Sequence, residues 1–498
     1  MAERTMHWSS QRIFILAAIG SAIGFGNIWR FPYLAYENGG GAFLIPYFIA
    51  LFVAGIPLML LELGVGNKTK AGAAQAFRDL VGRKKEWIGW LAVVAATILV
   101  TYYAVIIGWA VDYAYFSLDL AYGANPESFF FNDFLATTDG PLCLGAVNWV
   151  IVAGLVITWI WIYLSIFKGV HSVEKMVLLT VFAPWALIIL FVVNGFTLPG
   201  AMDGVAYYLT PDFARLLDPH IWIAAFGQIF YTLSLAMAVM IAYASYLPDK
   251  VDITKSAITI SLANCFTSMF AGLAVFTTLG FLAHQSGVAV SEVVSSGIGL
   301  AFVVYPAAIA QLPIFPEVLG VLFFIMLVTL GIDSAFSLAE AVSTSIFDDY
   351  PHLNRKVTIA ALCGILFLIG IFFTTGGGFY WLDIIDHYFN TFMLLIIGIL
   401  ETLAIGWIFG ADKIRENLNS LSAWKIGRWF DLSIKFIVPL VLGVLLVLNV
   451  ISELSEPYGG YDPLALGIGF TFVVIAGTAA SFIIARVMQT KRCLEKTP

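Results

Sequence analysis

Polar residues that could bind a ligand interrupt an apolar stretch near the start of the chain. The run 13–36 contains Gly20, Gly24, Asn27 and Arg30. A glycine within a helix costs about 1 kcal/mol relative to alanine, and an arginine at mid-membrane depth costs roughly 3 kcal/mol on insertion scales. A plain membrane anchor would avoid these residues. They predict a helix that breaks inside a membrane, so that its freed backbone groups can hold a ligand.

A second interruption and an acidic residue point to related chemistry. The segment 231–234 (Tyr-Thr-Leu-Ser) interrupts the apolar run 222–246, and Asp333 lies in an apolar run without Lys or Arg. A carboxylate at membrane depth needs a cation or a proton. Oxygens of carbonyls, hydroxyls, amides and carboxylates are the ligands that hard cations prefer. The pattern therefore indicates a cation site built on broken helices.

The elements that position these residues are membrane helices. Of the 498 residues, 60% are hydrophobic and 11% are charged, against about 25% charged in a soluble domain. Apolar runs of spanning length predict twelve transmembrane helices, at 13–36, 42–66, 88–118, 147–166, 173–194, 222–246, 256–283, 317–347, 357–375, 380–409, 433–452 and 464–487. The apolar stretch 298–312 is interpreted as a short helical flap bracketed by Pro306 and Pro313, not as a span.

Basic residues gather in the loops of one side. Of 25 Lys and Arg residues, only Arg30 and Arg215 fall outside the tails and loops assigned to that side, and the loops 119–146, 284–316 and 453–463 have none. The positive-inside rule then places both termini in the cytoplasm. The short tails and the short loop 119–146, which lacks a cysteine pair, favour a multi-pass plasma-membrane protein of a prokaryote.

The two interrupted runs are the first and the sixth of the twelve. They begin two successive groups of five helices, 13–194 and 222–409, and 433–487 holds helices 11 and 12. Because five is odd, the second group enters the membrane from the opposite side. Interrupted spans at corresponding places in inverted halves are typical of a transporter binding site. The prediction is an all-α membrane protein, one transporter domain over 1–498, with an inverted repeat and unwound helices 1 and 6.

The chain resembles the neurotransmitter:sodium symporter family, and most of all its bacterial amino-acid transporters. The resemblance covers almost the whole chain and rests on GNIWRFPYLAYENGGGAFLIPY at 26–47, TYYAVIIGW at 101–109, GQIFYTLSLAMAVMIAYASY at 227–246, LGIDSAFS at 330–337 and WIFGADK at 407–413. It implies the leucine-transporter fold and sodium-coupled import of a neutral, apolar amino acid by alternating access.

The resemblance implies two sodium ions. One site would use the carbonyl of Ala22 and the side chains of Asn27, Thr232 and Asn264, with the substrate carboxylate. The second would use the carbonyls of Gly20, Ile23 and Leu330 and the side chains of Asp333 and Ser334. An interhelical hydrogen bond is the alternative role for Asn264.

The resemblance also predicts one chloride ion, at Tyr47, Gln228, Thr232, Asn264 and Ser268. Chloride-independent relatives carry an acid at the position of Ser268. Two sodium ions, a zwitterion and the Asp333 carboxylate leave one positive charge in a low dielectric, which a chloride would offset. The alternative is that Ser268 bonds within its own helix and another acid balances the charge.

A glycine at position 24 indicates the class of cargo. Family members that carry aromatic monoamines have an aspartate there, so Gly24 favours a substrate with its own carboxylate. That group would face the start of the half-helix after the break. The expected substrate-binding residues are Ser21, Ala22, Phe25, Gly26, Leu99, Tyr103, Tyr231, Thr232, Ser234, Met237, Ser334 and Leu338. Taurine or betaine is the alternative cargo, and ordinary packing is the alternative role of Met237 and Leu338.

The resemblance places gates on both sides of the site. Arg30 and Asp386 would form an outer ion pair, although Arg30 alone could reach outer headgroups. Trp8, Tyr246 and Asp348 match the inner gate. The arginine that usually lies three residues before the tryptophan is displaced to Arg4, which leaves its pairing with Asp348 open.

Rival functions have little support in the sequence. The six His residues lie in tails, loops or helix ends without metal-site spacing, and no GxxxxGK[ST] loop occurs, so we do not expect an enzyme or an ATP-driven pump. A channel would require repeated rings of pore-lining residues, whereas the pattern here indicates one asymmetric central site. A non-transporting amino-acid sensor on the same fold stays open. The expected partners are the small substrate and the lipid bilayer, with no nucleic acid, and no pattern indicates an oligomeric state.

Overall fold

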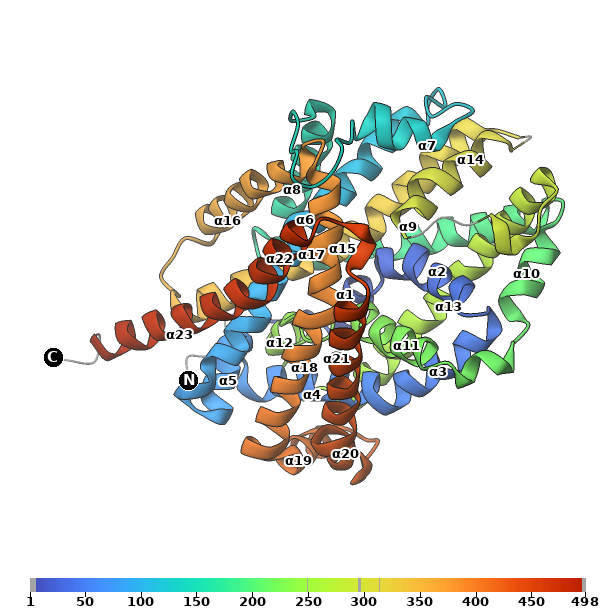
Figure 1. Cartoon of the computed structure of the whole chain (residues 1–498). Helices are drawn as coiled ribbons and strands as arrows, with labels where there is room; N and C mark the ends of the chain where they lie inside the picture. Colours follow the sequence, from blue (N-terminus) through green and yellow to red (C-terminus); the bar gives the residue numbers. More distant parts are fainter. Residues whose placement is uncertain (1–5, 249, 294–296, 313, 495–498) are drawn as a thin grey trace.

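The computed structural model describes residues 6–248, 250–293, 297–312 and 314–494, and in these residues the chain is helical without a β-strand (Figure 1). Within these described residues, ten helices are long and apolar enough to cross a membrane, and a bent helix pair at the start makes eleven. Four of the spans after that pair are single helices: α8 Trp149–Ile166, α9 Val170–Phe196, α13 Ile253–Ser286 and α15 Pro316–Asp349. Two more consist mostly of one helix, with α6 Glu86–Phe116 in the span Arg83–Phe116 and α16 Arg355–Gly370 in the span Arg355–Thr374. The other four contain several helices: Gly41–Thr69 (α3 Gly41–Ala50 and α4 Ile56–Thr69), Gly378–Leu421 (α17 Gly378–Tyr388, α18 Leu394–Leu403 and α19 Ala411–Leu421), Trp429–Gly460 (α20 Trp429–Leu432 and α21 Val438–Ser455) and Pro463–Cys493 (α22 Pro463–Phe470 and α23 Gly477–Leu494). Shorter helices are α5 Ala73–Val81, α7 Pro126–Ser128 and α10 Ala201–Leu209.

The first span is broken, as its polar residues predict. Helix α1 (Gln11–Ala22) begins where the Ser10 hydroxyl accepts from the Ile13 amide. It ends at Ile23, which is extended (φ −84°, ψ 110°). The chain resumes as a helix over Gly26–Glu37, which includes α2 (Phe31–Glu37), bent by 57° from α1. The Asn27 side chain accepts from the Gly24 amide at 2.8 Å and so replaces a lost backbone bond at the break.

The sixth predicted span, 222–246, is split into α11 (Pro219–Thr232) and α12 (Val239–Ser245), so no continuous helix has its full length. Between them Ser234, Ala236 and Ala238 have φ values of 52°, 61° and 62°. Left-handed backbone costs a non-glycine residue of the order of 1–3 kcal/mol, so neighbouring groups must hold this segment. Glu62 of α4 provides one such contact, because its carboxylate accepts from the Ala236 amide at 2.8 Å.

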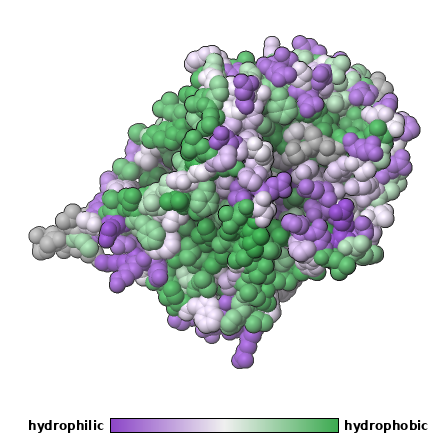
Figure 2. Space-filling model, viewed as in Figure 1, coloured by the Kyte–Doolittle hydropathy of each residue, from purple (hydrophilic) through white to green (hydrophobic). Residues whose placement is uncertain are grey.

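Burial separates central helices from lipid-facing ones. In the most apolar stretch of α6, 83% of residues are buried, against 22% in the span that contains α21 and 28% in that of α23. Helix α6 packs along α15 and α8, and α1 packs against α9, α13 and α15. Figure 2 shows broad apolar areas on one face of the molecule. The outer helices therefore present the surface that lipid covers, and the broken helices lie among the buried ones.

The predicted flap is a helix, but its boundary residue is placed differently. A π-helical turn over Leu300–Val304 continues into α14 (Tyr305–Ala310). Pro306 therefore lies inside this helix and does not bracket it. Proline is tolerated there because it falls in the first turn of α14, where its missing N–H matters least. Pro313 is outside the described residues.

Candidate functional site

A cavity of about 20 Å³ lies between the two breaks. This space is sufficient for roughly one water molecule, so a ligand of amino-acid size requires the lining side chains to move apart. Its lining residues come from the break of the first span, from α6, from α11 and the second break, and from α15. They are Ala22, Gly24, Gly26, Asn27, Leu99, Tyr103, Tyr231, Thr232, Ser234, Met237, Ser334 and Leu338. Ten of the twelve expected substrate-binding residues are among them, and none of the lining side chains is charged.

Ser21 and Phe25 do not line the cavity, in contrast to the expectation. The Ser21 hydroxyl lies 2.7 Å from that of Ser337 and therefore faces α15. The Phe25 ring stacks on Trp29 with 4.3 Å between centroids and also contacts Tyr103. Both residues lie in or next to the break, where helical periodicity no longer fixes the direction of a side chain.

Backbone groups of the first break form hydrogen bonds with hydroxyl groups from three elements. The Ser21 carbonyl accepts from Ser234 at 3.1 Å and from Ser334 at 3.0 Å. The Phe25 amide donates to the Tyr103 hydroxyl at 3.2 Å. The second break, α15 and α6 are thus joined to the first break through groups that a bound ligand could also use.

Only glycine fits at position 24 in this arrangement. A Cβ there would lie 2.7 Å from the Ser334 hydroxyl oxygen and 2.7 Å from the Tyr103 hydroxyl oxygen. The site therefore holds no side chain at the position where an acidic one would meet an amine.

Asp333 of α15 faces the end of α1. One carboxylate oxygen accepts from the Thr180 hydroxyl at 2.5 Å. The other, Oδ2, is buried without a hydrogen-bond partner, and it lies so close to Gly20 that a Cβ there would be 2.3 Å away. An unpartnered buried carboxylate oxygen is costly. The residues expected to share this ion, Ile23, Leu330 and Ser334, lie at the end of α1 and on α15, and this donor set fits a hard cation.

A second group of oxygens gathers around Asn264 of α13. One terminal atom of its amide lies 3.0 Å from the Ala22 carbonyl oxygen and 3.3 Å from the Thr232 carbonyl oxygen. As nitrogen, this atom donates to both carbonyls; as oxygen, it accepts from the Asn27 amide and faces the two carbonyl oxygens, an arrangement that a cation would stabilise. The Asn27 amide lies 2.9 Å away. Among the residues that the structure describes, no group of three or more His, Cys, Asp or Glu could hold a metal ion, so an ion at these sites needs carbonyl, amide and hydroxyl ligands.

The residues expected to bind chloride lie beside this group. The Tyr47 hydroxyl donates to the Ser268 hydroxyl at 3.4 Å, and the Asn27 amide donates to the same oxygen at 2.8 Å. Thr232 lies 3.1 Å from the Asn264 amide. Gln228 is turned toward the first break instead: its amide donates to the Gly26 carbonyl at 2.8 Å, and its oxygen is buried without a partner.

The outer ion pair is not formed in this structure. The Arg30 guanidinium lies over the Tyr231 ring at 4.6 Å from its centroid. Asp386 accepts from the Tyr102 hydroxyl at 2.8 Å, and no ion pair within 4.0 Å joins these two described side chains. The cation–π contact and the phenol satisfy the two charges separately. Arg30 nevertheless covers a tyrosine that lines the cavity, so it is positioned over the ligand site.

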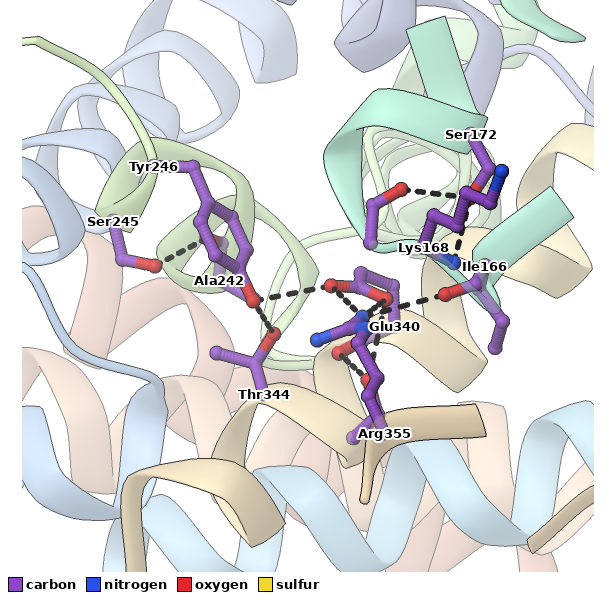
Figure 3. Close-up of polar contacts among 11 residues, drawn as sticks. Ile166, Lys168, Ser172, Ala242, Ser245, Tyr246, Glu340, Thr344 and Arg355 are labelled. Atoms are coloured by element: carbon purple, nitrogen blue, oxygen red, sulfur yellow. Dashed lines mark hydrogen bonds and ion pairs between the residues drawn. The ribbon is translucent and has the colours of Figure 1, made fainter. Parts of the chain in front are cut away.

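The residues expected at the inner gate lie in a hydrogen-bond network larger than the sequence predicts. The Trp8 indole donates to the Tyr243 carbonyl at 2.8 Å, and Asp348 accepts from the Gly72 amide at 2.6 Å. The Arg4 pairing lies outside the described residues. Figure 3 shows Tyr246, Thr344, Glu340 and Arg355 in one cluster. Tyr246 donates to the Glu340 carboxylate at 3.1 Å.

Glu340 and Arg355 were not among the predicted site residues. Arg355 donates to both Glu340 oxygens, at 2.8 and 2.5 Å, and Glu340 is fully buried. This pair ties α15 to the start of α16. Two sequence features could have indicated it: an acid in the apolar run 317–347, and a basic residue just before the next run. Glu62, an acid in the apolar run 42–66, is also buried, and it accepts from the Ala236 amide in the second break.

Known proteins resemble this chain over nearly its whole length. The model of the sodium:neurotransmitter symporter family matches residues 5–124 and 120–493. An uncharacterized sodium-dependent transporter of Methanocaldococcus jannaschii is 42% identical over 489 residues, which are 98% of each chain. Sodium- and chloride-dependent GABA transporter 2 of Homo sapiens is 34% identical over 94% of this chain and 82% of its own. The human sodium- and chloride-dependent taurine transporter is 32% identical over 97% of this chain and 85% of its own.

Proposed function

The chain belongs to the sodium:neurotransmitter symporter family, and on that premise we propose that it imports a neutral, apolar amino acid together with two sodium ions by alternating access. It is a sodium-dependent symporter of this family and not an enzyme. We place it in the plasma membrane of a prokaryote with both termini in the cytoplasm, and we assign the two five-helix repeats to 13–194 and 222–409.

The main support for sodium coupling is the Asp333 carboxylate at the first break. The buried, unpartnered Oδ2 of Asp333 lies against the end of the broken helix α1. A carboxylate held at membrane depth without a basic partner requires a positive ion, and the broken helix supplies free carbonyls beside it. Sodium binding there would join α1 to α15, so that occupancy of the site favours one arrangement of the two elements. This is the differential affinity that coupling requires.

The ligand we propose is a zwitterion. Its carboxylate would face the start of the helix Gly26–Glu37, the Tyr103 hydroxyl and the sodium ion at Asn27 and Asn264. Its ammonium would take backbone carbonyls of the two breaks. Its side chain would lie against Leu99, Met237 and Leu338, a lining without charge, and a neutral apolar side chain fits such a surface.

We propose that chloride is required as well. Two sodium ions, a zwitterion and the Asp333 carboxylate leave one net positive charge at the centre of the protein, which an anion would neutralise. Ser268 carries no charge to offset it, and Tyr47, Asn27 and Ser268 converge at one point. The names of the GABA and taurine relatives include chloride dependence.

The names of two relatives favour a second class of substrate. The names of the human proteins that are 34% and 32% identical specify GABA and taurine. Each is a zwitterion whose amine lies farther from its acid group than in an α-amino acid. Such a ligand would use the same contacts at the first break and would extend its amine toward the second.

Uptake into proteoliposomes tests the function. The purified protein should accumulate one labelled candidate from a panel of the twenty amino acids, GABA, taurine and betaine when sodium is higher outside. Accumulation should stop when sodium is replaced by choline, and should fall strongly when chloride is replaced by gluconate. Unchanged uptake in gluconate would refute chloride dependence, and sodium-dependent binding without accumulation would identify a sensor instead of a symporter.

A further inference from the structure

A pocket outside the transport site lies between the start of α6 and the middle of α23. It has a volume of about 430 Å³ and is open to the surroundings; its lining consists of Lys84, Trp87, Phe482, Ile483, Ala485, Arg486 and Gln489. The Trp87 and Phe482 rings stack with 4.1 Å between centroids. The Gln489 amide donates to the Arg83 carbonyl at 2.6 Å and closes one end. Helix α23 projects from the body of helices there (Figure 1).

The basic residues of this pocket lack acidic partners. Lys84 and Arg486 are exposed, and neither forms an ion pair with any residue that the structure describes. The nearby acids are already neutralised, because Arg492 pairs with Glu86 at 2.9 Å and also with Asp349. The adjoining turn Arg83–Lys85 adds two more exposed cations. The pocket is therefore strongly positive.

The rest of the pocket surface is apolar and continuous with the lipid-facing side of α23. Phe482, Ile483 and Val487 are 47%, 63% and 55% exposed. An aromatic side chain and basic residues at the end of a span are typical of the level of the lipid headgroups. At that level the charged side chains can contact a phosphate, and toward the bilayer centre the apolar side chains can contact acyl chains.

We propose that this pocket binds an anionic phospholipid of the cytoplasmic leaflet. Lys84 and Arg486 hold its phosphate, Trp87 lies at the glycerol level, and its chains follow Phe482, Ile483 and Val487. Basic pockets between spans on the cytoplasmic side are suited to such headgroups. The bound lipid bridges α6, which lines the transport cavity through Leu99 and Tyr103, to the peripheral helix α23. Only the choice of leaflet rests on the proposed orientation.

Native mass spectrometry of the purified full chain in a neutral detergent tests this proposal. The protein is titrated with phosphatidylglycerol or with phosphatidylcholine. We compare the wild type, K84Q/R486Q, the charge-conserving K84R/R486K, and K175Q/K356Q, which removes two exposed basic residues far along the chain from the pocket. Each basic group near an anionic surface changes affinity about fivefold, so K84Q/R486Q should bind phosphatidylglycerol roughly 30-fold more weakly. K84R/R486K and K175Q/K356Q should bind within about twofold of the wild type.

Three results would overturn the proposal. They are equal retention of both lipids by the wild type, unchanged retention of phosphatidylglycerol by K84Q/R486Q, and equal loss in K84Q/R486Q and K175Q/K356Q. Competition by inorganic phosphate alone at lipid concentrations would indicate a phosphate site, which also contradicts it. The masses do not depend on transport, so failure here leaves the proposed function untouched. K84R/R486K shows whether the pocket still folds when its charges are kept.

Discussion

Replacing Asp333 by asparagine removes the negative charge at the end of α1 while the volume of the side chain is kept. The amide oxygen can still accept from Thr180. The amide nitrogen, however, takes the place of Oδ2 and presents hydrogens to the carbonyls near Gly20. The perturbation is therefore confined to the charge and to one ligand of the proposed ion.

The expected loss is large. Removing one partner of a buried ion pair costs about 3–5 kcal/mol, which corresponds to a roughly 150- to 4,000-fold weaker binding of sodium. Sodium-dependent uptake should then be undetectable at physiological sodium. Binding of the ligand should need far more sodium than in the wild type. A sodium titration of substrate binding in detergent measures both effects on folded protein.

Asp112 provides the matched control. Its Oδ2 is also buried without a partner, but it lies against Gly154 of α8, away from the two breaks. D112N should therefore keep its sodium affinity within about threefold of the wild type. The reasoning is refuted if D333N binds sodium as the wild type does, or if D112N loses as much affinity as D333N.

Three further predictions follow from the same site and from the proposed topology. G24A should weaken substrate binding roughly tenfold or more, because its Cβ meets Tyr103 and Ser334 at 2.7 Å and overpacking costs about 1–3 kcal/mol; equilibrium binding measures this, and unchanged affinity would show that the ligand does not occupy the break. S268E should transport in gluconate as well as in chloride, because its carboxylate replaces the anion; uptake that still requires chloride would contradict the charge balance. Cys143 and Cys493 are exposed, and a membrane-impermeant maleimide applied to intact cells should label C493S but not C143S; the reverse labelling would place the termini outside.

The cavity could be predicted from the sequence because its residues interrupt apolar runs. Gly24, Asn27 and Thr232 are each conspicuous where lipid-facing or packed residues are expected, and helical spacing then brings neighbours such as Leu99 and Tyr103 onto one face. The motifs of the resemblance supplied the pairing between distant runs, which spacing alone cannot give.

What could not be predicted depends on directions inside the breaks and on the choice among partners. Ser21 and Phe25 turn away from the cavity because a broken helix has no fixed period. Arg30 has two possible partners in reach of one flexible side chain, and the structure selects Tyr231 over Asp386. The Glu340–Arg355 pair does not follow from either apolar run alone, because the contact joins two helices.

Labelled sodium flux measures the proposed coupling between sodium and substrate. Proteoliposomes are loaded with equal sodium on both sides, and external substrate is added. Substrate should drive the entry of labelled sodium, with two ions for each substrate molecule in the wild type and no stimulated entry in D333N. Substrate entry without accompanying sodium in the wild type would contradict the proposed coupling.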